Sequence, residues 1–372
     1  MPRQSQGDVA NRAFAAPYQI GKLGLMTVSR GPGARPRLRP PALPCQMHAM
    51  LKALSETPTL LGALCALGAV FCFSVNDTAI KFLSDGYALH EVVLFRSLIG
   101  MTVLLTVLLP LSGGLAALRT RRLALHLARG GCVVFANMTF FLGLASLQLA
   151  DGVALFFVSP AIITVFSVIF LGEHVGPGRW AAIAVGLLGV LVILRPGTSV
   201  FQPAALLPIA AAFGYATLHM LTRYIGRTEN AMSMSFYIQV TFIVVSAVTG
   251  LAIGDGRYAS GLDGASLEFL LREWSMPHGR DWLVLIAVGV TSAFGGYLIS
   301  QAYRVAEVAA VAPIEYVAMP LAVIWGVTVF GEWPDWIAVA GILLIIGSGL
   351  VMVLAEARGR HAGVPQTPRY RR

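Results

Sequence analysis

The sequence predicts an all-α integral membrane protein with ten transmembrane helices, arranged as two inverted five-helix repeats. Of the 372 residues, 56% are hydrophobic and only 12% are charged, which is about half the charged share of a soluble domain. The mean hydropathy is +0.74. Ten apolar segments follow one another, most of them long enough to cross a hydrocarbon core of about 30 Å. The first five also resemble the last five in sequence.

The chain begins with a segment unlike the rest. Residues 1–56 are rich in Pro, Gly and Arg, as in the run GPGARPRLRPP, and contain no apolar region followed by a small-residue cleavage site. We interpret them as a disordered, basic cytosolic tail, or as an over-extended gene start, since Met47 and Met50 lie just before the first apolar segment. The predicted domains are the tail 1–56, the repeats 57–196 and 197–355, and a basic cytosolic tail 356–372.

Ten apolar segments account for the region between the tails. Most are separated by short polar breaks, except for a basic loop at Arg119, Arg121 and Arg122 and a longer polar loop over residues 254–281. The fifth segment is short, and it would need a tilted neighbour or a thin local bilayer. The segments are 60–83, 90–110, 123–148, 152–171, 179–194, 204–224, 232–253, 282–304, 308–330 and 334–354.

The Lys and Arg residues predict the orientation, because cytoplasmic loops carry an excess of them. If the first segment enters from the inside, the inner loops and tails hold 20 of the 27 Lys and Arg residues. The outer loops hold Arg195, Arg257, Arg272 and Arg280. Both termini are therefore expected on the cytoplasmic side of the cell inner membrane.

Composition and motifs exclude several classes of protein. The net charge of +9 arises mainly from the tails and loops, so we expect no nucleic-acid partner. The four cysteines show no metal-ligand spacing, so we expect no metal and no other cofactor. An intramembrane enzyme would carry a motif such as HExxH, paired aspartates or a Ser/His pair at membrane depth. The sequence has none of these, and we predict no enzymatic activity and no catalytic residues.

An internal repeat relates the two halves. FSVNDTAIKFL in the first segment pairs with FGYATLHMLTRYI in the sixth, which puts Lys81 opposite Arg223 and Arg96 close to Gln239. PAIITVFSVIFLGE in the fourth segment pairs with PLAVIWGVTVFGE in the ninth. Because each half has five spans, an odd number, the second half is expected upside down relative to the first. Such inverted repeats are characteristic of alternating-access transporters, whose substrate site lies near the bilayer midplane.

These motifs also carry a family resemblance. A proline, an apolar run and Gly-Glu end the fourth segment of each half, at Glu173 and Glu332, and the first segment has the pattern Asp77-x-x-x-Lys81 with Arg96 on the next. Because these motifs follow one another in this order and the Gly-Glu motif occurs in both halves, the region between the tails resembles the EamA family of the drug/metabolite transporter (DMT) superfamily. The resemblance implies an inner-membrane carrier for small metabolites that does not hydrolyse ATP. The first-segment pattern looks most like the branch of bacterial uptake carriers for riboflavin and S-adenosylmethionine.

Charged residues inside the segments are the first candidates for function, because a charge at the bilayer centre costs about 2.5–3.5 kcal/mol on insertion scales. Asp77 and Lys81 are four residues apart, hence on one helix face and able to pair. Arg96 lies at a similar depth on the next segment and could share Asp77. One hypothesis makes this cluster an outer gate or a contact for substrate charge. The alternative is a static ion cluster that ties the two spans together, with Lys81 reaching outward.

Glu315, within APIEYVAMP, is the candidate for proton coupling, because a carboxylate inside the membrane can bind and release a proton in a coupled carrier. A Glu hydrogen-bonded to a neighbouring helix would look the same in the sequence. Pro160 and Pro320 each remove one backbone hydrogen bond and should kink their spans. A central aqueous cavity can satisfy the carbonyl groups that these prolines free, so we expect both to line it.

Further polar and aromatic side chains at membrane depth are candidates as a set. Each by itself is more typical of an interhelical hydrogen bond, worth about 0.6 kcal/mol on average, than of a ligand contact. Together they can line a site that offers polar groups and aromatic stacking faces. The candidates are Asn76, Asn137, Tyr215, Gln239, Gln301, Tyr316 and Trp325, with His219 interpreted as an interfacial histidine. Glu173 and Glu332 are interpreted as structural groups that cap the next helix.

The sequence thus predicts a secondary-active transporter of a small organic metabolite that works by alternating access, with proton coupling as an option. Vitamin- or cofactor-like uptake, of riboflavin or S-adenosylmethionine type, is the favoured substrate class. Export of amino acids, other metabolites or drugs is the alternative, and a membrane scaffold that transports nothing is the rival from another class. The expected partners are the small-molecule substrate and the lipid bilayer, with the chain as monomer or homodimer.

Overall fold

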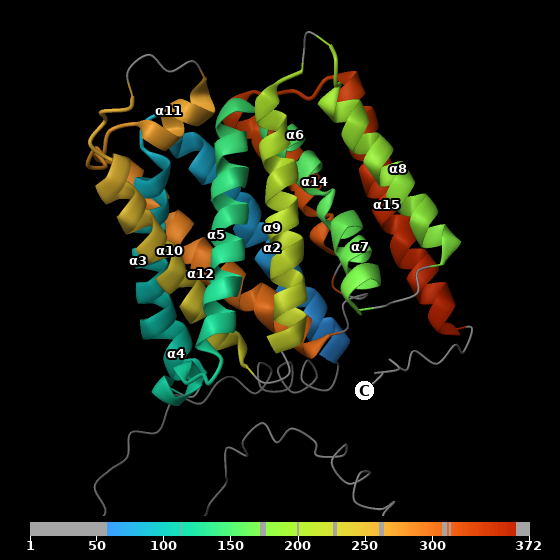
Figure 1. The fold of residues 1–372 in the computed structure, drawn as a ribbon, viewed down its shortest axis with the longest axis horizontal. Coiled ribbons are helices and arrows are strands. Elements are labelled where there is room, and N and C mark those ends of the chain that lie inside the picture. Colours follow the sequence, from blue (N-terminus) through green and yellow to red (C-terminus); the bar gives the residue numbers. More distant parts are fainter. Residues whose placement is uncertain are drawn as a thin grey trace, which may run out of the picture. The chain divides into compact units, whose positions relative to one another are not determined.

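All regular structure in the described residues is helical (Figure 1). The computed structural model describes residues 58–112, 114–171, 176–198, 201–225, 229–259, 264–306, 311 and 314–361. The predicted N-terminal tail, the end of the C-terminal tail and Glu173 lie outside these residues. The elements are α2 (Pro58–Leu83), α3 (Leu89–Val103), η1 (Leu104–Leu108), α4 (Leu109–Leu111), η2 (Gly114–Leu118), α5 (Leu123–Ser146), α6 (Leu149–Phe156), α7 (Ser159–Leu171), α8 (Pro177–Leu194), η3 (Pro203–Ala205), α9 (Leu206–Ile225), α10 (Ala231–Ile253), α11 (Ala265–Leu271), α12 (Asp281–Val305), α14 (Ala318–Trp325), η4 (Gly326–Phe330) and α15 (Trp336–His361).

Ten apolar helical stretches fall at the ten predicted positions. Seven of them are long and apolar enough to cross a membrane: Leu60–Leu83, Leu89–Leu111, Leu123–Ser146, Leu149–Phe170, Pro203–Thr222, Ala231–Ile253 and Asp281–Ala302. Three are shorter: Trp180–Leu194, Ala318–Phe330 and Trp336–Val351. The membrane-embedded character of the chain is thereby supported, whereas the full ten-span arrangement stays a prediction.

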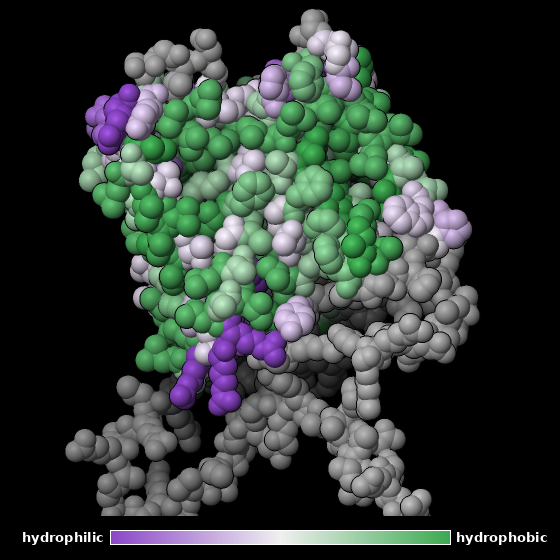
Figure 2. Space-filling model, in the orientation of Figure 1, coloured by the Kyte–Doolittle hydropathy of each residue, from purple (hydrophilic) through white to green (hydrophobic). Residues whose placement is uncertain are grey.

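The outward-facing surface suits lipid rather than water. Large apolar side chains are exposed along the helices, and Leu251 and Leu283 are 87% and 68% exposed. Figure 2 shows a predominantly hydrophobic face over α5, α7 and α9, with hydrophilic atoms gathered at its upper and lower rims. Soluble monomers rarely expose contiguous apolar surface on this scale. A bilayer would cover it.

The helices pack in pairs. α2 packs on α12, α5 on α9, α3 on α10, α6 on α14 and α8 on α15, and Figure 1 shows the last pair side by side at the right. Small residues allow such close approach of membrane helices. At the crossing of α8 and α15, a Cβ atom added to Gly189 would lie 2.8 Å from the backbone oxygen of Gly341. Each of the five pairs joins the first predicted repeat to the second.

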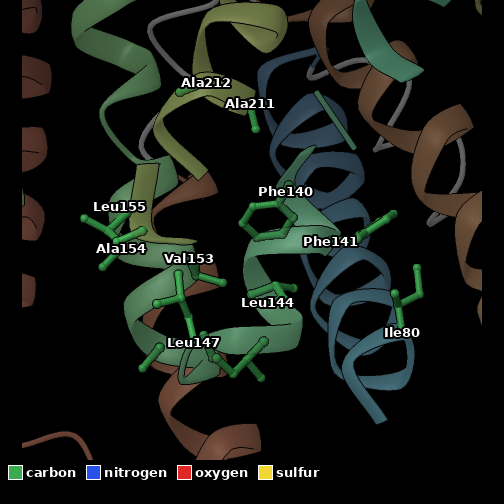
Figure 3. Close-up of a cluster of buried hydrophobic side chains, with 14 of the residues drawn as sticks. Ile80, Phe140, Phe141, Leu144, Leu147, Val153, Ala154, Leu155, Ala211 and Ala212 are labelled. Carbon is green, nitrogen blue, oxygen red and sulfur yellow. The ribbon is translucent and has the colours of Figure 1, made fainter. Parts of the chain in front are cut away.

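A hydrophobic core lies between α2, α5, α6 and α9 (Figure 3). Phe140, Phe141 and Leu144 of α5 are each at most 7% exposed. The rings of Phe140 and Phe156, at the end of α6, have centroids 5.1 Å apart. This core fixes the end of α6, where the candidate site begins.

The predicted orientation leads to a simple test. A cytoplasm-dependent reporter fused after Arg372 should be active, because the Lys and Arg bias puts both termini inside. The same reporter placed between α10 and α12, in the predicted outer loop 254–281, should be inactive. A reporter dependent on the periplasm should give the reverse pattern. An active periplasmic reporter at the C-terminus would contradict both the topology and the inverted repeat.

Candidate functional site

The fourth and ninth predicted spans are each interrupted. α6 ends at Phe156 and α7 starts at Ser159, and a turn at residues 316–317 precedes α14. Pro160 and Pro320 each lie in the first turn of the second segment, where the missing N–H costs no hydrogen bond. Each proline thus lies at the start of a new helical segment, which goes one step beyond the kink that the sequence predicts.

The two breaks lie against each other. The rings of Phe157 and Tyr316, one from each break, have centroids 5.0 Å apart. Beside them, the ring of Phe156 lies 5.1 Å from that of Tyr215 on α9. Tyr215 in turn contacts His219 at 4.3 Å in an edge-on arrangement. His219, expected to be interfacial, thus belongs to an aromatic cluster that links both breaks to α9.

Glu315 lies immediately before the second break. It directly precedes Tyr316 in the chain. The two predicted site residues Tyr215 and Tyr316 contact the adjacent rings of Phe156 and Phe157 at the first break. The proton-coupling role of Glu315 stays a prediction.

A small cavity lies between α2, α6 and α14. It has a volume of about 10 Å³ and is lined by Ser74, Asp77, Leu149, Val153, Ala318 and Ala322. This volume is enough for about one water molecule. Among the described residues, the Asp77 carboxylate makes no ion pair and no hydrogen bond. Next to the cavity, Trp325 donates from Nε1 to Ser74 Oγ at 3.2 Å. We call this space the central cavity.

Arg96 is a buried cation with few direct polar contacts among the described residues. Its residue is 2% exposed, and its guanidinium carbon lies 5.5 Å from the ring centre of Phe141 and 4.5 Å from that of Phe242. Among the described residues, its Nε and Nη2 atoms have no hydrogen-bond partner. Asp77 acts on Arg96 through space, but within the described part of the chain the two form no ion pair. Gln239 on α10 is also buried, and its Oε1 atom accepts no hydrogen bond from the residues that the structure describes.

The expected pairing of Lys81 with Asp77 is wrong. Lys81 Nζ lies 2.8 Å from Glu332 Oε1 and also donates to the carbonyl oxygen of Leu147. The other Glu332 oxygen accepts a hydrogen bond from the backbone N–H of Leu149 at 3.0 Å, so Glu332 caps α6. It does not cap the next helix, α15, as its position in the sequence suggested. Glu332 comes from the other half of the chain, and it places a carboxylate within reach of Lys81 at the start of α6.

A second ion pair lies at the same end. Arg195 Nη2 donates to Asp335 Oδ2 at 2.6 Å, and Asp335 Oδ1 accepts from the backbone N–H of Ala338 at 2.7 Å. The hydrogen bond from Arg195 holds the pKa of Asp335 below its usual value. The pair therefore stays ionised at neutral pH. We call Lys81, Glu332, Arg195 and Asp335 the outer clamp, after the predicted topology, because both pairs join the first predicted repeat to the second.

The remaining predicted site residues are spread over the bundle. Asn76 donates from Nδ2 to the carbonyl oxygen of Val288 at 3.1 Å, which joins α2 to α12. Gln301 Nε2 donates to Tyr297 Oη at 3.2 Å within α12. Asn137 is partly buried on α5. None of these three predicted residues lines the central cavity, and the contacts of Asn76 and Gln301 match the structural alternative.

Sequence reasoning missed a buried cation on α5. Arg129 is 4% exposed and donates to Thr222 Oγ1 at 2.7 Å and to the carbonyl oxygen of Met234 at 3.2 Å, joining α5 to α9 and α10. One turn earlier, His126 lies 3.3 Å from Glu229. The spacing of His126 and Arg129 on one helix face, inside an apolar segment, was the signal that could have revealed both.

Known proteins similar to this chain are membrane carriers. The sequence model of the EamA-like transporter family matches residues 60–195 and 202–354. A riboflavin transporter of Vibrio cholerae is 30% identical over 77% of this chain and 92% of the relative. An S-adenosylmethionine uptake transporter of Rickettsia prowazekii is 26% identical over 81% of this chain and 95% of the relative. The pseudopaline exporter CntI of Pseudomonas aeruginosa is 27% identical over 77% of this chain and 93% of the relative.

A solved crystal structure shares the fold. The match has a TM-score of 0.58 at 20% sequence identity, and it covers 82% of this chain and 99% of the other. At 20% sequence identity, this match shows only that the helices of the two proteins are arranged alike.

Proposed function

Since the chain belongs to the EamA-like transporter family, we propose that it carries a small organic metabolite across the bacterial inner membrane by alternating access. The observation that carries this proposal is the meeting of two helix breaks at Phe157 and Tyr316. Broken helices bring polar groups to membrane depth, and in secondary transporters they form the substrate site between two repeats. The substrate then passes between the breaks, beside Asp77 on one side and Glu315 on the other.

The proposal includes two inverted repeats, residues 57–196 and 197–355, and the helix pairs support it. Such a repeat relates the first span to the sixth and the third to the eighth. The packing of α2 on α12, first on eighth, then has its counterpart in the packing of α9 on α5, sixth on third. The pairs α3 with α10, α6 with α14 and α8 with α15 each join equivalent spans. The whole set of pairs is therefore unchanged when the two halves are exchanged.

For the substrate, we propose uptake of a vitamin- or cofactor-like molecule of the riboflavin or S-adenosylmethionine type. The relatives named for these substrates match over 92% and 95% of their length. The site offers suitable chemistry, because Phe157 and Tyr316 present faces on which a flat ring can stack, and Asp77 offers a carboxylate to a cation or a hydrogen-bond donor. Export is the second candidate, since an exporter matches as well.

Flux in proteoliposomes tests the proposed function. Vesicles holding the purified protein should take up labelled riboflavin or S-adenosylmethionine with saturation, and unlabelled substrate inside should accelerate the uptake by counterflow. Vesicles holding the Asp77→Asn variant are the matched control. Saturable uptake of other metabolites, with no uptake of riboflavin or S-adenosylmethionine, would contradict the proposed substrate class. Absence of counterflow with every metabolite tried would favour the scaffold and contradict transport.

A variant of Glu315 distinguishes proton coupling from substrate transport. If it carries the coupling proton, Glu315→Gln should abolish uptake driven by a proton gradient while leaving substrate exchange largely intact, because exchange needs no net proton movement. The measurement compares the two fluxes in the same vesicles. Glu268→Gln is the control, since Glu268 is 58% exposed on α11 and both fluxes should persist. Loss of both fluxes at Glu315 would assign it to substrate binding, and loss of neither would make it a packing residue.

A further inference from the structure

An apolar groove runs over the seam between α5 and α9. Its volume is about 470 Å³, and its lining includes Ala128, Gly131 and Phe135 from α5, Phe213 and Thr217 from α9, and Phe166 from α7. The α5 lining includes the small residues Ala128 and Gly131, and phenylalanines from α5, α7 and α9 complete the apolar lining. The α5 residues lie three or four positions apart, so they follow one helix face. The groove therefore extends along the helices, in the direction of lipid chains.

Basic side chains lie at one end of this seam. Arg122, just before α5, has its guanidinium carbon 5.9 Å from the ring centre of Tyr224 near the end of α9. Arg119 and Arg121 are exposed beside it, and Figure 2 shows the hydrophilic atoms at the lower rim, below α5 and α9. In the described part of the chain, these three arginines make no ion pair with an acidic side chain. The nearby Glu229 is engaged by His126 and Thr120.

The spacing of the two features fits one lipid molecule. Ala128 and Phe135 follow Arg122 by six and thirteen residues, which is about 9 Å and 20 Å along a helix. Half of a hydrocarbon core of about 30 Å is about 15 Å. An acyl chain of the leaflet at Arg122 would thus lie in the groove while its headgroup stays at the basic end.

We propose that the α5–α9 seam is a binding site for one anionic phospholipid of the leaflet at Arg122. The acyl chain fills the groove over Gly131, and the phosphate group lies between Arg121 and Arg122. A second copy of the chain fits this face less well, because a twofold contact through the seam would bring the arginines of both copies together. The lipid would bridge the two predicted repeats, since α5 belongs to the first and α9 to the second.

Native mass spectrometry of the full chain, extracted from equal mixtures of phosphatidylglycerol and phosphatidylcholine, tests the site. The unaltered protein should retain phosphatidylglycerol in preference to phosphatidylcholine. Because basic side chains at the membrane surface attract anionic lipids, Arg121→Gln with Arg122→Gln should lower that preference about tenfold or more. Gly131→Phe should remove bound lipid of either kind, since a Cβ atom at Gly131 meets no atom of the described residues within 4 Å and the ring is free to fill the groove.

Gly347→Phe is the matched control for the groove variant. Gly347, on α15, also has no atom within 4 Å of an added Cβ, so this variant should retain lipid as the unaltered protein does. Equal retention of both lipids by the unaltered protein would overturn the proposal, and this arm needs no variant to fold. Retention of equal amounts of lipid by Gly131→Phe and Gly347→Phe would overturn the proposal as well. Dimers that disappear with Gly131→Phe would assign the seam to a second copy instead.

Discussion

Asp77→Asn should abolish transport while the protein still inserts. The carboxylate faces the central cavity without an ion pair or hydrogen bond from the described residues, so it is available to a substrate or a proton. Its loss also leaves Arg96 buried without its nearest charge, a situation that typically costs about 3–5 kcal/mol when the lost partner was in direct contact. Here the two residues are not in contact, so we expect a smaller fall in abundance than in transport. Uptake per molecule of inserted protein is the measurement.

Two further variants separate stability from function at this position. Asp77→Asn with Arg96→Met removes the uncompensated cation and places an apolar side chain between Phe141 and Phe242. Abundance should recover in this double variant, whereas transport should not. Asp77→Glu keeps the charge and should keep abundance and part of the transport. Normal uptake by Asp77→Asn alone, at normal abundance, would remove Asp77 from the site.

Removing the cations of the outer clamp should open the central cavity to the outside. Lys81→Met and Arg195→Leu leave Glu332 and Asp335 without partners and so weaken the contact between the predicted repeats at this end. Ala322 lines the cavity and is 3% exposed, so Ala322→Cys reports access in a background without the native cysteines. We expect a membrane-impermeant maleimide to label it at least about tenfold faster, which corresponds to a shift of about 1.4 kcal/mol in the opening equilibrium.

An ion pair elsewhere at the same end provides the control. Arg257 pairs with Asp255 at 2.6 Å, but both residues belong to one loop and their side chains are 58% and 49% exposed. Arg257→Leu should therefore leave the labelling rate unchanged. Equal labelling with and without the clamp would mean that the ion pairs do not hold the cavity closed. Labelling only from the cytoplasmic side would contradict the orientation.

The helical fold could be predicted because long apolar runs have few alternatives in a membrane. Most helix ends lie within a few residues of the predicted ones, as for α2 and α10. The interruptions at Pro160 and Pro320 were missed in degree, since a proline in an apolar run is compatible with either a kinked helix or a new helix start. Which of the two occurs depends on neighbours such as Phe157 and Tyr316, which come from distant parts of the chain.

The roles of the individual site residues stay predictions, whereas one expected pair of them is contradicted. Depth in the membrane could select residues such as Asp77, which lines the central cavity, and Tyr316, which packs on Phe157, but it could not predict their partners. The partner of Lys81 could not be predicted, because spacing along one helix favours Asp77, whereas Glu332 lies 251 positions away. A carboxylate that also caps α6 is fixed in place and so competes successfully for the lysine.

The size of the central cavity has a consequence for measured affinity. A molecule as large as a flavin cannot enter a space for one water, so only the fraction of protein molecules in which the cavity has opened can bind it. The apparent dissociation constant is the intrinsic constant divided by that fraction, so that a 1% open population weakens observed affinity about 100-fold. Side chains outside the cavity lining thus set how tightly a substrate is held. Variants of Lys81 or Arg195 should bind substrate more tightly than the unaltered protein does.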